Sequence, residues 1–263
     1  MMRLQKFLSH AGACSRRTGE EWIAAGRVSV NNEVITTPGF SVDPETDRVE
    51  VDGKLLTIVP ERVTIALNKP QGYVTSCSQP QEKIVLELVD LGRRLYPVGR
   101  LDKDSTGLIL LTDNGELHHR LSHPSFDHEK EYVVETRYDL ADRDLERLAR
   151  PMEVLGKQTR PARVQRISRR KFSLVLQEGM NRQIRRMLGN VGHDVASLQR
   201  VRIAHIHIGD LALGAWRILS EKEVQKLLEG GGPKTSSGRS RSGGPADRGG
   251  EGRPEKKPSR ERK

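Results

Sequence analysis

YPVGRLDKDSTGLILLT, residues 96–112, joins a polar loop directly to a short apolar run. The run covers residues 108–111 and is bounded by Gly107 and by the turn-forming residues 113–115, a pattern typical of a buried strand that ends in a turn. Residues 99–107 contain two cations, two carboxylates, two hydroxyls and two glycines. A strand fixes such a loop, and glycines let a ligand approach its backbone. The stretch therefore predicts a reactive site beside a sheet, with a solvated surface turn as the alternative.

The composition narrows the class of protein. The chain has 263 residues, 35% of them hydrophobic and 30% charged, so it is long enough for one or two domains with apolar cores. It has no run of about 18 apolar residues, which argues against a membrane-spanning helix, and it begins without the apolar stretch of a secretory signal. Cys14 and Cys77 lie far apart, which fits a reducing cytosol and argues against a disulfide framework or a cysteine zinc site. We therefore expect a cytoplasmic protein.

The charge of the chain points to its partner. A net charge of +10 and a pI near 9.8 favour a polyanion, most simply nucleic acid, with an anionic membrane surface as the alternative. Residues 230–263 contain ten basic and four acidic residues, a net charge of +6. This segment consists mainly of Gly, Ser, Pro and charged residues and has too little apolar surface to order itself. We expect residues 229–263 to be a disordered basic tail, which is either an electrostatic arm for RNA or a solubility tail.

Residues 1–58 have the pattern of a small domain. Apolar residues recur at helical spacing from Leu4 to Ala11, and Ser15 can cap a second helix over residues 16–25. Short strands are expected at residues 27–30, 34–35 and 48–51. The helical half carries five cations, which form either a solvated face or a compact phosphate-binding surface. They are Arg3, Lys6, Arg16, Arg17 and Arg27.

A second module, residues 62–228, is expected to follow a linker around Pro60. Strand patterns occur at residues 63–67, 108–111, 132–136, 172–177 and 198–208, and helical patterns at 116–121, 142–148 and 182–189. Because strands dominate and helices are inserted irregularly, we expect an α+β domain around a largely antiparallel sheet. Neither G-x-x-x-x-G-K-[ST] nor a strand-linked G-x-G-x-x-G is present, which excludes the ordinary nucleotide-cofactor sites.

Three further stretches supply the residue types that a pocket for an extruded base requires. Tyr132 lies near the start of a predicted strand, where its ring can stack on a planar base. Residues 178–187 place three arginines near the start of a helix, and Leu198 lies in a stretch of basic residues. Together with Asp102, they offer a reactive carboxylate, a stacking ring, a cation to keep the carboxylate ionised and an apolar floor.

These motifs carry a resemblance to a known family. LNKPQGYVTS, VGRLDKDSTGLILLT, DHEKEYVV, EGMNRQIRRM and LGAWRILS resemble the RsuA-type pseudouridine synthases, and RLQKFLSHAGACSRRTGEEWIAAGRVSVNN resembles the S4 RNA-binding domain. DKDS, DHEKEY and MNRQIRRM are most similar to the F branch, which acts on large-subunit rRNA. The resemblance covers residues 3 to about 228 and implies an S4 domain, residues 1–58, and a pseudouridine synthase domain, residues 62–228. It also implies a monomer without metal or organic cofactor that binds large-subunit ribosomal RNA, with tRNA as a further candidate, and no membrane.

The resemblance also assigns roles to individual residues. Asp102 corresponds to the essential carboxylate, Tyr132 to the aromatic residue of the second motif, and Arg185 to the basic partner of the aspartate. Four further residues correspond to positions around the substrate: Arg100, Leu198, Lys69 and Arg182.

The reaction itself needs few groups. Isomerising uridine breaks the C1′–N1 bond, turns the uracil and forms a new bond through C5. Asp102 can serve as nucleophile or as base, and the sequence leaves both roles open. Asp104 is a rival carboxylate, for which the simpler interpretation is a cap on its own turn. His119 and His123 at helical spacing could bind zinc, but a surface helix end is the simpler interpretation.

Two other classes of function stay open at this point. A non-catalytic S4-type ribosome-assembly factor would keep the basic face without needing Asp102, Tyr132 and Arg185 together. A metal-dependent RNA phosphoesterase would use Asp102 and Asp104 as metal ligands, and a chelator would inactivate it.

Overall fold

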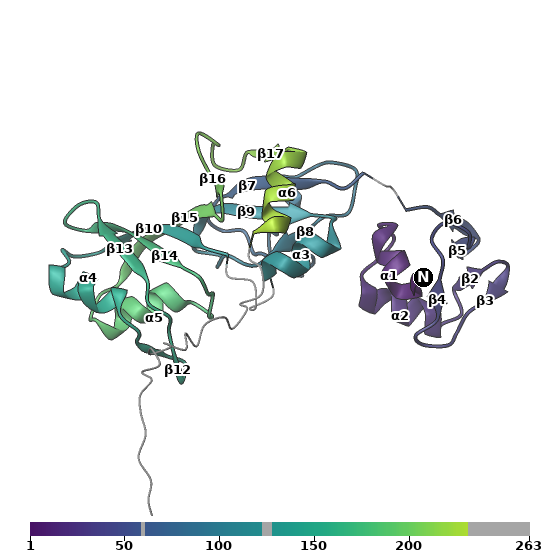
Figure 1. Cartoon of the computed structure of the whole chain (residues 1–263), viewed down its shortest axis with the longest axis horizontal. Helices are drawn as coiled ribbons and strands as arrows, with labels where there is room; N and C mark the ends of the chain where they lie inside the picture. Colours follow the sequence, from purple (N-terminus) through teal and green to yellow (C-terminus); the bar gives the residue numbers. More distant parts are fainter. Residues whose placement is uncertain (59–60, 123–127, 231–263) are drawn as a thin grey trace, which may run out of the picture. The chain divides into compact units, whose positions relative to one another are not determined.

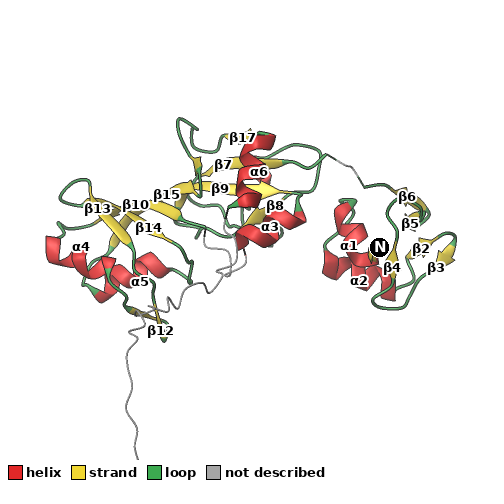
Figure 2. Ribbon diagram, in the orientation of Figure 1, coloured by secondary structure: helices red, strands yellow, loops and turns green. Residues whose placement is uncertain are grey.

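The structure is a computed structural model that describes residues 1–58, 61–122 and 128–230 (Figures 1 and 2). Pro60 of the expected linker, His123, Asp127 and the expected tail from residue 231 lie outside the described residues. Within the described ranges, no helix is both long and apolar enough to cross a bilayer. Residues up to 58 and residues from 63 onward contribute to separate apolar clusters, so the two parts are described in turn.

Residues 1–58 form two helices and two small sheets, drawn in purple in Figure 1. The elements are β1 (Met2–Arg3), α1 (Leu4–His10), α2 (Arg16–Ala24), β2 (Val28–Val30), β3 (Glu33–Val34), β4 (Ser41–Val42), β5 (Val49–Val51) and β6 (Lys54–Leu56). β1 pairs with β4, and the other four strands form an antiparallel sheet in the order β3-β2-β5-β6. Leu4, Phe7 and Leu8 are buried and pack with Val28 and Val49 in one apolar cluster.

Local sequence signals set most of these boundaries. The Ser15 hydroxyl oxygen accepts a hydrogen bond from the Thr18 N–H at 3.0 Å and so caps α2. Asn31 and Asn32, with φ of 51° and 70°, adopt the left-handed conformations that a tight hairpin between β2 and β3 requires. The two predicted helices and this hairpin are confirmed. β1, β4 and β6 were not predicted, because they lack the alternating valines that mark β2 and β5.

A nine-stranded sheet organises residues 61–230. The elements are β7 (Thr64–Lys69), the 3-10 helix η1 (Val85–Leu88), β8 (Tyr96–Val98), β9 (Thr106–Thr112), α3 (Gly115–Ser122), β10 (Lys130–Thr136), α4 (Asp142–Ala149), β11 (Glu153–Val154), β12 (Lys157–Gln158), β13 (Arg163–Arg166), β14 (Lys171–Leu176), α5 (Gln183–Asn190), β15 (Val195–Ile203), β16 (Ile206–His207), β17 (Trp216–Ile218) and α6 (Glu221–Glu229). The sheet order is β13-β14-β10-β15-β9-β7-β17, with β16 beside β15 and β8 beside β9, while β11 and β12 pair separately. Every described pairing in this sheet is antiparallel except β9 with β15. The predicted α+β class is therefore confirmed.

The central strands are covered on both faces. All six residues of β7 and the last six of β9 are buried. Ile109 and Leu111 belong to the apolar cluster that includes residues of α4 and α5, whereas Leu108 and Leu110 belong to the cluster with α3 and α6. A strand that is covered on both faces needs no polar alternation, which explains the continuous apolar run of residues 108–111.

The two halves of the sheet join at one short parallel contact. β9 and β15 pair through Thr106 with Gln199 and Gly107 with Arg200. Gly107 has a φ of 106°, and a Cβ added there would lie closer than 3.0 Å to the Arg200 carbonyl oxygen, so this junction requires glycine. The polar loop of residues 99–105 comes directly before β9. The fold therefore places that loop where the halves meet.

Candidate active site

Two adjoining cavities lie at this junction. One, of about 560 Å³, is lined by residues of β10, β15, α5 and the 99–105 loop, and the other, of about 520 Å³, by that loop and residues 71–75. Both cavities are lined by Asp102 and Arg182. The larger cavity brings together six of the seven residues predicted for the pocket, namely Asp102, Tyr132, Arg185, Arg100, Leu198 and Arg182.

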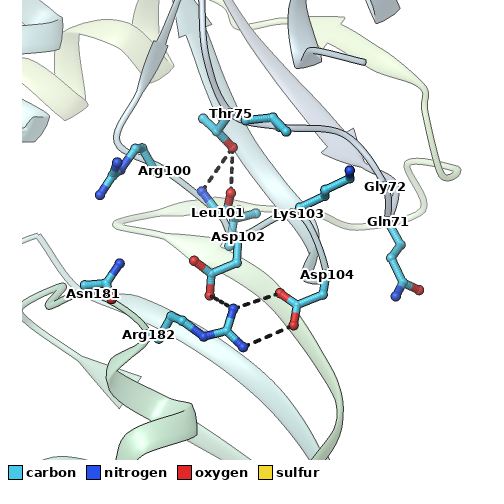
Figure 3. Close-up of a pocket in the computed structure, with 11 residues that line it drawn as sticks. Gln71, Gly72, Thr75, Arg100, Leu101, Asp102, Lys103, Asp104, Asn181 and Arg182 are labelled. Carbon is cyan, nitrogen blue, oxygen red and sulfur yellow. Dashed lines mark hydrogen bonds and ion pairs between the residues drawn. The ribbon is translucent and has the colours of Figure 1, made fainter. Parts of the chain in front are cut away.

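A tight turn fixes the backbone of Asp102. The Ser105 N–H donates to the Asp102 carbonyl oxygen at 3.1 Å. The Thr75 hydroxyl donates to the Leu101 carbonyl oxygen at 2.8 Å and accepts from the Leu101 N–H at 3.2 Å (Figure 3). The Asp102 side chain stays 31% exposed. The carboxylate is therefore accessible although the backbone that carries it is held on both sides.

Lys69, at the end of β7, is fully buried beneath this turn. Its ammonium donates to the carbonyl oxygens of Ser105 at 2.7 Å, Asp102 at 3.1 Å and Lys103 at 3.4 Å, and also to that of Pro70 at 3.1 Å. Burial lowers the pKa of Lys69 to about 8, although the carboxylates of Asp104 and Asp102 act in the opposite direction. The prediction that Lys69 contacts substrate is wrong in this structure. Every residue of β7 is buried, so the ammonium finds its partners among the loop carbonyls.

Arg200 is a second buried cation at the same loop, and it is only 2% exposed. Its Nε donates to the Leu108 carbonyl oxygen at 2.7 Å, and its Nη1 donates to the Arg100 carbonyl oxygen at 3.4 Å. Arg200 thus binds the chain on both sides of the turn, while Lys69 binds the turn itself. Together, the two cations fix the loop through its backbone and leave its carboxylates facing the cavities.

Two carboxylates and two guanidinium groups meet beside the cavities. Figure 3 shows Arg182 between the carboxylates of Asp102 and Asp104. Arg182 Nη1 lies 3.7 Å from Asp102 Oδ2, and Arg182 Nη2 lies 3.4 Å from Asp104 Oδ2. Arg185 Nη2 lies 3.0 Å from Asp104 Oδ2. Arg182 precedes α5 with a φ of 51°, a left-handed conformation that costs a non-glycine residue about 1 kcal/mol. Strained conformations of this kind concentrate at functional sites.

This arrangement corrects two expectations. Arg185 is paired with Asp104 and not with Asp102, whose ion-pair partner among the described residues is Arg182. Asp104 in turn accepts from arginines of the α5 region and does not cap its own turn. The physical reason is the geometry of the turn, which presents the two carboxylates side by side to the beginning of α5.

β10 and β15 supply the apolar wall of the larger cavity. Tyr132 lies opposite Arg200, and Val134 lies opposite Leu198, in the antiparallel register. Residues opposite each other, and residues two apart on one strand, share a face of the sheet, so Tyr132, Leu198 and Arg200 share one. Tyr132 and Leu198 are 8% and 7% exposed. The wall therefore offers an aromatic ring and an aliphatic side chain, as a planar base requires.

The predicted RNA-binding cations of residues 1–58 fall into two groups. Arg3, Arg16 and Arg17 are exposed, and Lys6 is half-buried. Arg16 and Arg17 occupy the first turn of α2, where the helix dipole disfavours cations and favours anions such as phosphate. Arg27 differs, because it forms an ion pair with Asp52 and its guanidinium lies 4.8 Å from the Trp22 ring centroid. Its charge is already neutralised by Asp52, which weakens its predicted role in RNA binding.

Metal ligands are not grouped in the parts of the chain that the structure describes. No three His, Cys, Asp or Glu side chains there lie close enough together to hold a metal ion. His119 lies on α3, and its suggested zinc partner His123 lies outside the described residues.

Comparisons with known proteins identify the family of the chain. Residues 63–190 match the family described as RNA pseudouridylate synthase, and residues 2–49 match the S4 domain. The dual-specificity RNA pseudouridine synthase RluF of Escherichia coli K12 is 36% identical over 230 residues, covering 87% of this chain and 79% of the relative. The chain belongs to the RNA pseudouridine synthase family. Members of this family are isomerases.

Other members of the family give the same result. Ribosomal large subunit pseudouridine synthase B of Bacillus subtilis is 37% identical over 235 residues, covering 86% of this chain and 96% of the relative. A crystal structure titled as a pseudouridylate synthase superposes with a TM-score of 0.63 at 30% identity, covering 86% of this chain and all of the other. The resemblance to RsuA-type synthases with an S4 domain is confirmed, as is the similarity to RluF.

Four residues of the pseudouridine synthase site escaped the sequence analysis: Thr75, Asp104 as an arginine partner, Gly107 as a junction residue, and Arg200. Thr75 lies inside the motif LNKPQGYVTS, and Arg200 lies in the basic stretch that contains Leu198. Their partners lie 26 and 92 residues away along the chain, at Leu101 and Leu108. Composition and spacing within a motif therefore could not assign them.

Proposed function

We propose that the protein converts a uridine of large-subunit (23S) ribosomal RNA to pseudouridine, with a tRNA uridine as a second substrate. The observation that carries this proposal is the Asp102 carboxylate, which a fixed turn presents to a cavity walled by Tyr132 and Leu198. A cavity of about 560 Å³ is within the range of small-molecule sites and large enough for one extruded nucleoside. The names of the relatives RluF and large subunit synthase B support the substrate class.

The reaction leaves the composition of the nucleotide unchanged. The C1′–N1 bond breaks and a C1′–C5 bond forms, while N1 gains a proton and C5 loses one. Asp102 either attacks the sugar as a nucleophile or removes a proton from it as a base. In both cases, the departing uracil takes the electron pair of the C1′–N1 bond. Tyr132 and Leu198 would retain the detached uracil while it turns, which keeps the second bond formation intramolecular.

The positive groups around Asp102 support the same reaction. Lys69 and Arg200 donate hydrogen bonds to backbone carbonyl oxygens of the turn, and Arg182 lies 3.7 Å from the Asp102 carboxylate. Groups fixed in this way do not need to reorganise when charge moves during the reaction, which is the main source of electrostatic catalysis. We assign Asp102 and Tyr132 to catalysis, Arg185 to positioning of the Asp104 carboxylate, and Arg100, Arg182 and Leu198 to substrate contacts.

We further infer three segments: an S4 domain, residues 1–58; a pseudouridine synthase domain, residues 62–228; and a basic tail, residues 229–263. The separate apolar clusters support the first boundary. The exposed cations Arg3, Arg16 and Arg17, together with the half-buried Lys6, would bind RNA phosphates. We propose that the protein works as a monomer and, because both cysteines are free thiols, in a reducing cytoplasm.

The experiment that tests this function is a map of pseudouridine in ribosomal RNA and tRNA from cells with and without the protein. The expected result is one or a few uridines that stay unmodified when the protein is absent. The same RNA, transcribed in vitro, should be modified by the purified protein in the presence of a chelator. Full modification in the cells that lack the protein would refute the proposal, and activity lost on chelation would favour a metal-dependent enzyme.

A matched pair of variants tests the role of Asp102. Asp102→Asn should abolish turnover while RNA affinity stays within about threefold, because an amide can serve neither as nucleophile nor as base and phosphate contacts supply most of the affinity. Asp104→Asn removes a carboxylate from the same turn and should retain measurable turnover. If the Asp102→Asn variant turned over appreciably, the assignment of Asp102 would be wrong.

A further inference from the structure

One end of the sheet, away from the larger cavity, carries a group of exposed side chains that the reaction does not use. We call Arg137, Tyr138, Ile167, Arg169, Arg170 and Lys171 the tip surface. They come from the segment that follows β10, from the connection between β13 and β14, and from the first residue of β14 (Figure 1). All six are exposed, Tyr138 to 73% and Ile167 to 54%.

The two segments of the tip surface are fixed to each other. Thr136, only 1% exposed, donates its hydroxyl to the carbonyl oxygens of Tyr138 at 2.7 Å and Arg170 at 3.2 Å. The Leu140 N–H donates to the Arg169 carbonyl oxygen at 2.9 Å. The backbone beneath the tip surface is therefore ordered by buried hydrogen bonds, and its side chains project from a fixed platform.

The cations of the tip surface differ from their neighbours in having no acidic partner. Arg163 and Arg166, on the adjacent strand β13, form ion pairs with Glu129 and Asp142. By contrast, the four tip cations form no ion pair with any carboxylate of the described residues, although Asp139 lies in the same segment. Glu135 lies opposite Lys171 in the sheet register, so the charge of the tip surface is carried mainly by its three arginines. Arginines without an ion pair beside an exposed aromatic ring favour a polyanion with planar groups, which is the chemistry of RNA.

The tip surface lies within reach of RNA that occupies the cavity. Tyr132 lines the cavity, and Thr136, four residues further along the same strand, lies at the tip surface. Four residues of a strand span about 13 Å at about 3.3 Å per residue. Stacked nucleotides rise about 3.4 Å each, so this separation corresponds to about four nucleotides.

We propose that the tip surface is a second RNA-binding site, which takes nucleotides about four positions from the target uridine. Tyr138 stacks on an unpaired base, and Arg169, Arg170 and neighbouring cations bind the flanking phosphates. The proposal rests on the proposed action on RNA, and it adds a contact that would select a uridine by the structure around it. Such a contact acts on binding and leaves the chemical step unchanged.

The charge of the tip surface is tested with Arg169→Ala/Arg170→Ala. Binding of a hairpin RNA that contains the target is measured across a salt series, in the Asp102→Asn background so that the RNA stays unmodified. Loss of two phosphate contacts should reduce the slope of log K against log salt by about 1.4 to 1.8. Arg147→Ala/Arg150→Ala, which removes two cations from the α4 region, is the control and should keep the wild-type slope.

The aromatic residue is tested separately. Tyr138→Ala should weaken binding about tenfold without changing the salt slope, because stacking releases no counterions. Tyr138→Phe should bind like wild type, since the ring and not the hydroxyl makes the contact. In the wild-type background, Tyr138→Ala should raise KM and leave kcat unchanged.

The outcomes separate this inference from the proposed function. If wild type forms pseudouridine but the tip variants keep its affinity and salt slope, the tip surface does not bind RNA and the inference is wrong. An equal loss in the Arg147→Ala/Arg150→Ala control would also overturn it, because the effect would then reflect net charge alone. If wild type forms no pseudouridine, the proposed function fails, and the binding measurements still decide whether the tip surface contacts RNA.

Discussion

Cations perform opposite tasks in two regions of this protein. In residues 1–58, Arg16 and Arg17 lie exposed on the first turn of α2, where they meet solvent. Beneath the 99–105 loop, Lys69 and Arg200 are 0% and 2% exposed, and their hydrogen bonds go to backbone carbonyl oxygens. The first group offers its charge to a partner, while the second uses its donors to hold the chain.

This difference separates two contributions of positive charge, one to RNA affinity and one to the rate of the reaction. An exposed cation contributes to RNA binding through counterion release, so its effect depends on salt and is additive. A buried cation contributes through the order of the loop that carries Asp102, so its effect should appear in stability and kcat and should not depend on salt. Substitutions of Lys69 and of the exposed arginines and the pH dependence of Lys69 test this division, and a substitution of Gly107 tests the packing beside the loop.

The largest effect is expected for Lys69→Met. The substitution removes the donor of the Ser105 carbonyl oxygen and one of the two donors of the Asp102 carbonyl oxygen, at about 1.5 to 3 kcal/mol for each hydrogen bond to a charged group. We expect the free energy of unfolding to fall by about 3 to 5 kcal/mol and kcat to fall at least about 100-fold at every salt concentration. Denaturant unfolding and single-turnover kinetics measure the two effects. A wild-type free energy of unfolding together with a wild-type kcat would show that the 99–105 loop keeps its conformation without Lys69.

The next effect is expected at the junction of the two half-sheets. Gly107→Ala places a Cβ closer than 3.0 Å to the Arg200 carbonyl oxygen, so the contact between β9 and β15 must open. Gly99→Ala is the control, because Gly99 also has a positive φ of 71° but no atom within 4 Å of an added Cβ. Both substitutions cost about 1 kcal/mol for the left-handed backbone, and Gly107→Ala should lose at least about 2 kcal/mol more. Equal thermal stability of the two variants would contradict the close approach.

A smaller effect is expected from the exposed cations. Arg16→Ala/Arg17→Ala should weaken RNA binding about tenfold, lower the salt slope by about 1.4 to 1.8 and leave kcat unchanged. Arg27→Ala should lower the salt slope less than Arg16→Ala alone or Arg17→Ala alone, because Asp52 already neutralises Arg27. RNA binding is measured across a salt series for the three single variants and for the double variant. A slope change for Arg27→Ala as large as that for Arg16→Ala would restore Arg27 as a phosphate contact.

The smallest effect is a pH dependence of Lys69. Its pKa is lowered from 10.5 to about 8, so the rate should decrease a few-fold as pH rises through 8 and the ammonium beneath Asp102 loses its charge. Stability responds with the opposite sign. Between pH 8 and 10.5 the unfolded chain binds a proton that the folded protein does not, so this group contributes increasing stability as pH rises. Single-turnover rates from about pH 7 to about pH 9.5 should show the decrease in wild type and equally in Arg16→Ala/Arg17→Ala. A single-turnover rate that does not change through pH 8 would show that the charge of Lys69 does not contribute to the reaction.

Much of the fold could be predicted from local patterns. The Ser15 cap, the apolar run of residues 108–111 and the spacing of Leu4, Phe7 and Leu8 specify their elements through neighbouring residues. α6 was not predicted, although Ser220 and Glu223 form a capping box that the sequence displays. By contrast, β13 and β17 have few buried residues and little alternation, so their place in the sheet depends on the strands they pair with.

The sequence by itself determined which residue types the site contains: a carboxylate in a glycine-bounded loop, an aromatic residue, arginines at a helix start and a leucine. Only the tertiary structure decided which of them meet. It paired Arg185 with Asp104 across 81 residues, buried Lys69 beneath the loop and recruited Arg200 from the opposite half of the sheet. The physical reason is that the partner of a long charged side chain is set within a few ångströms, and the packing of distant strands and helices fixes those distances.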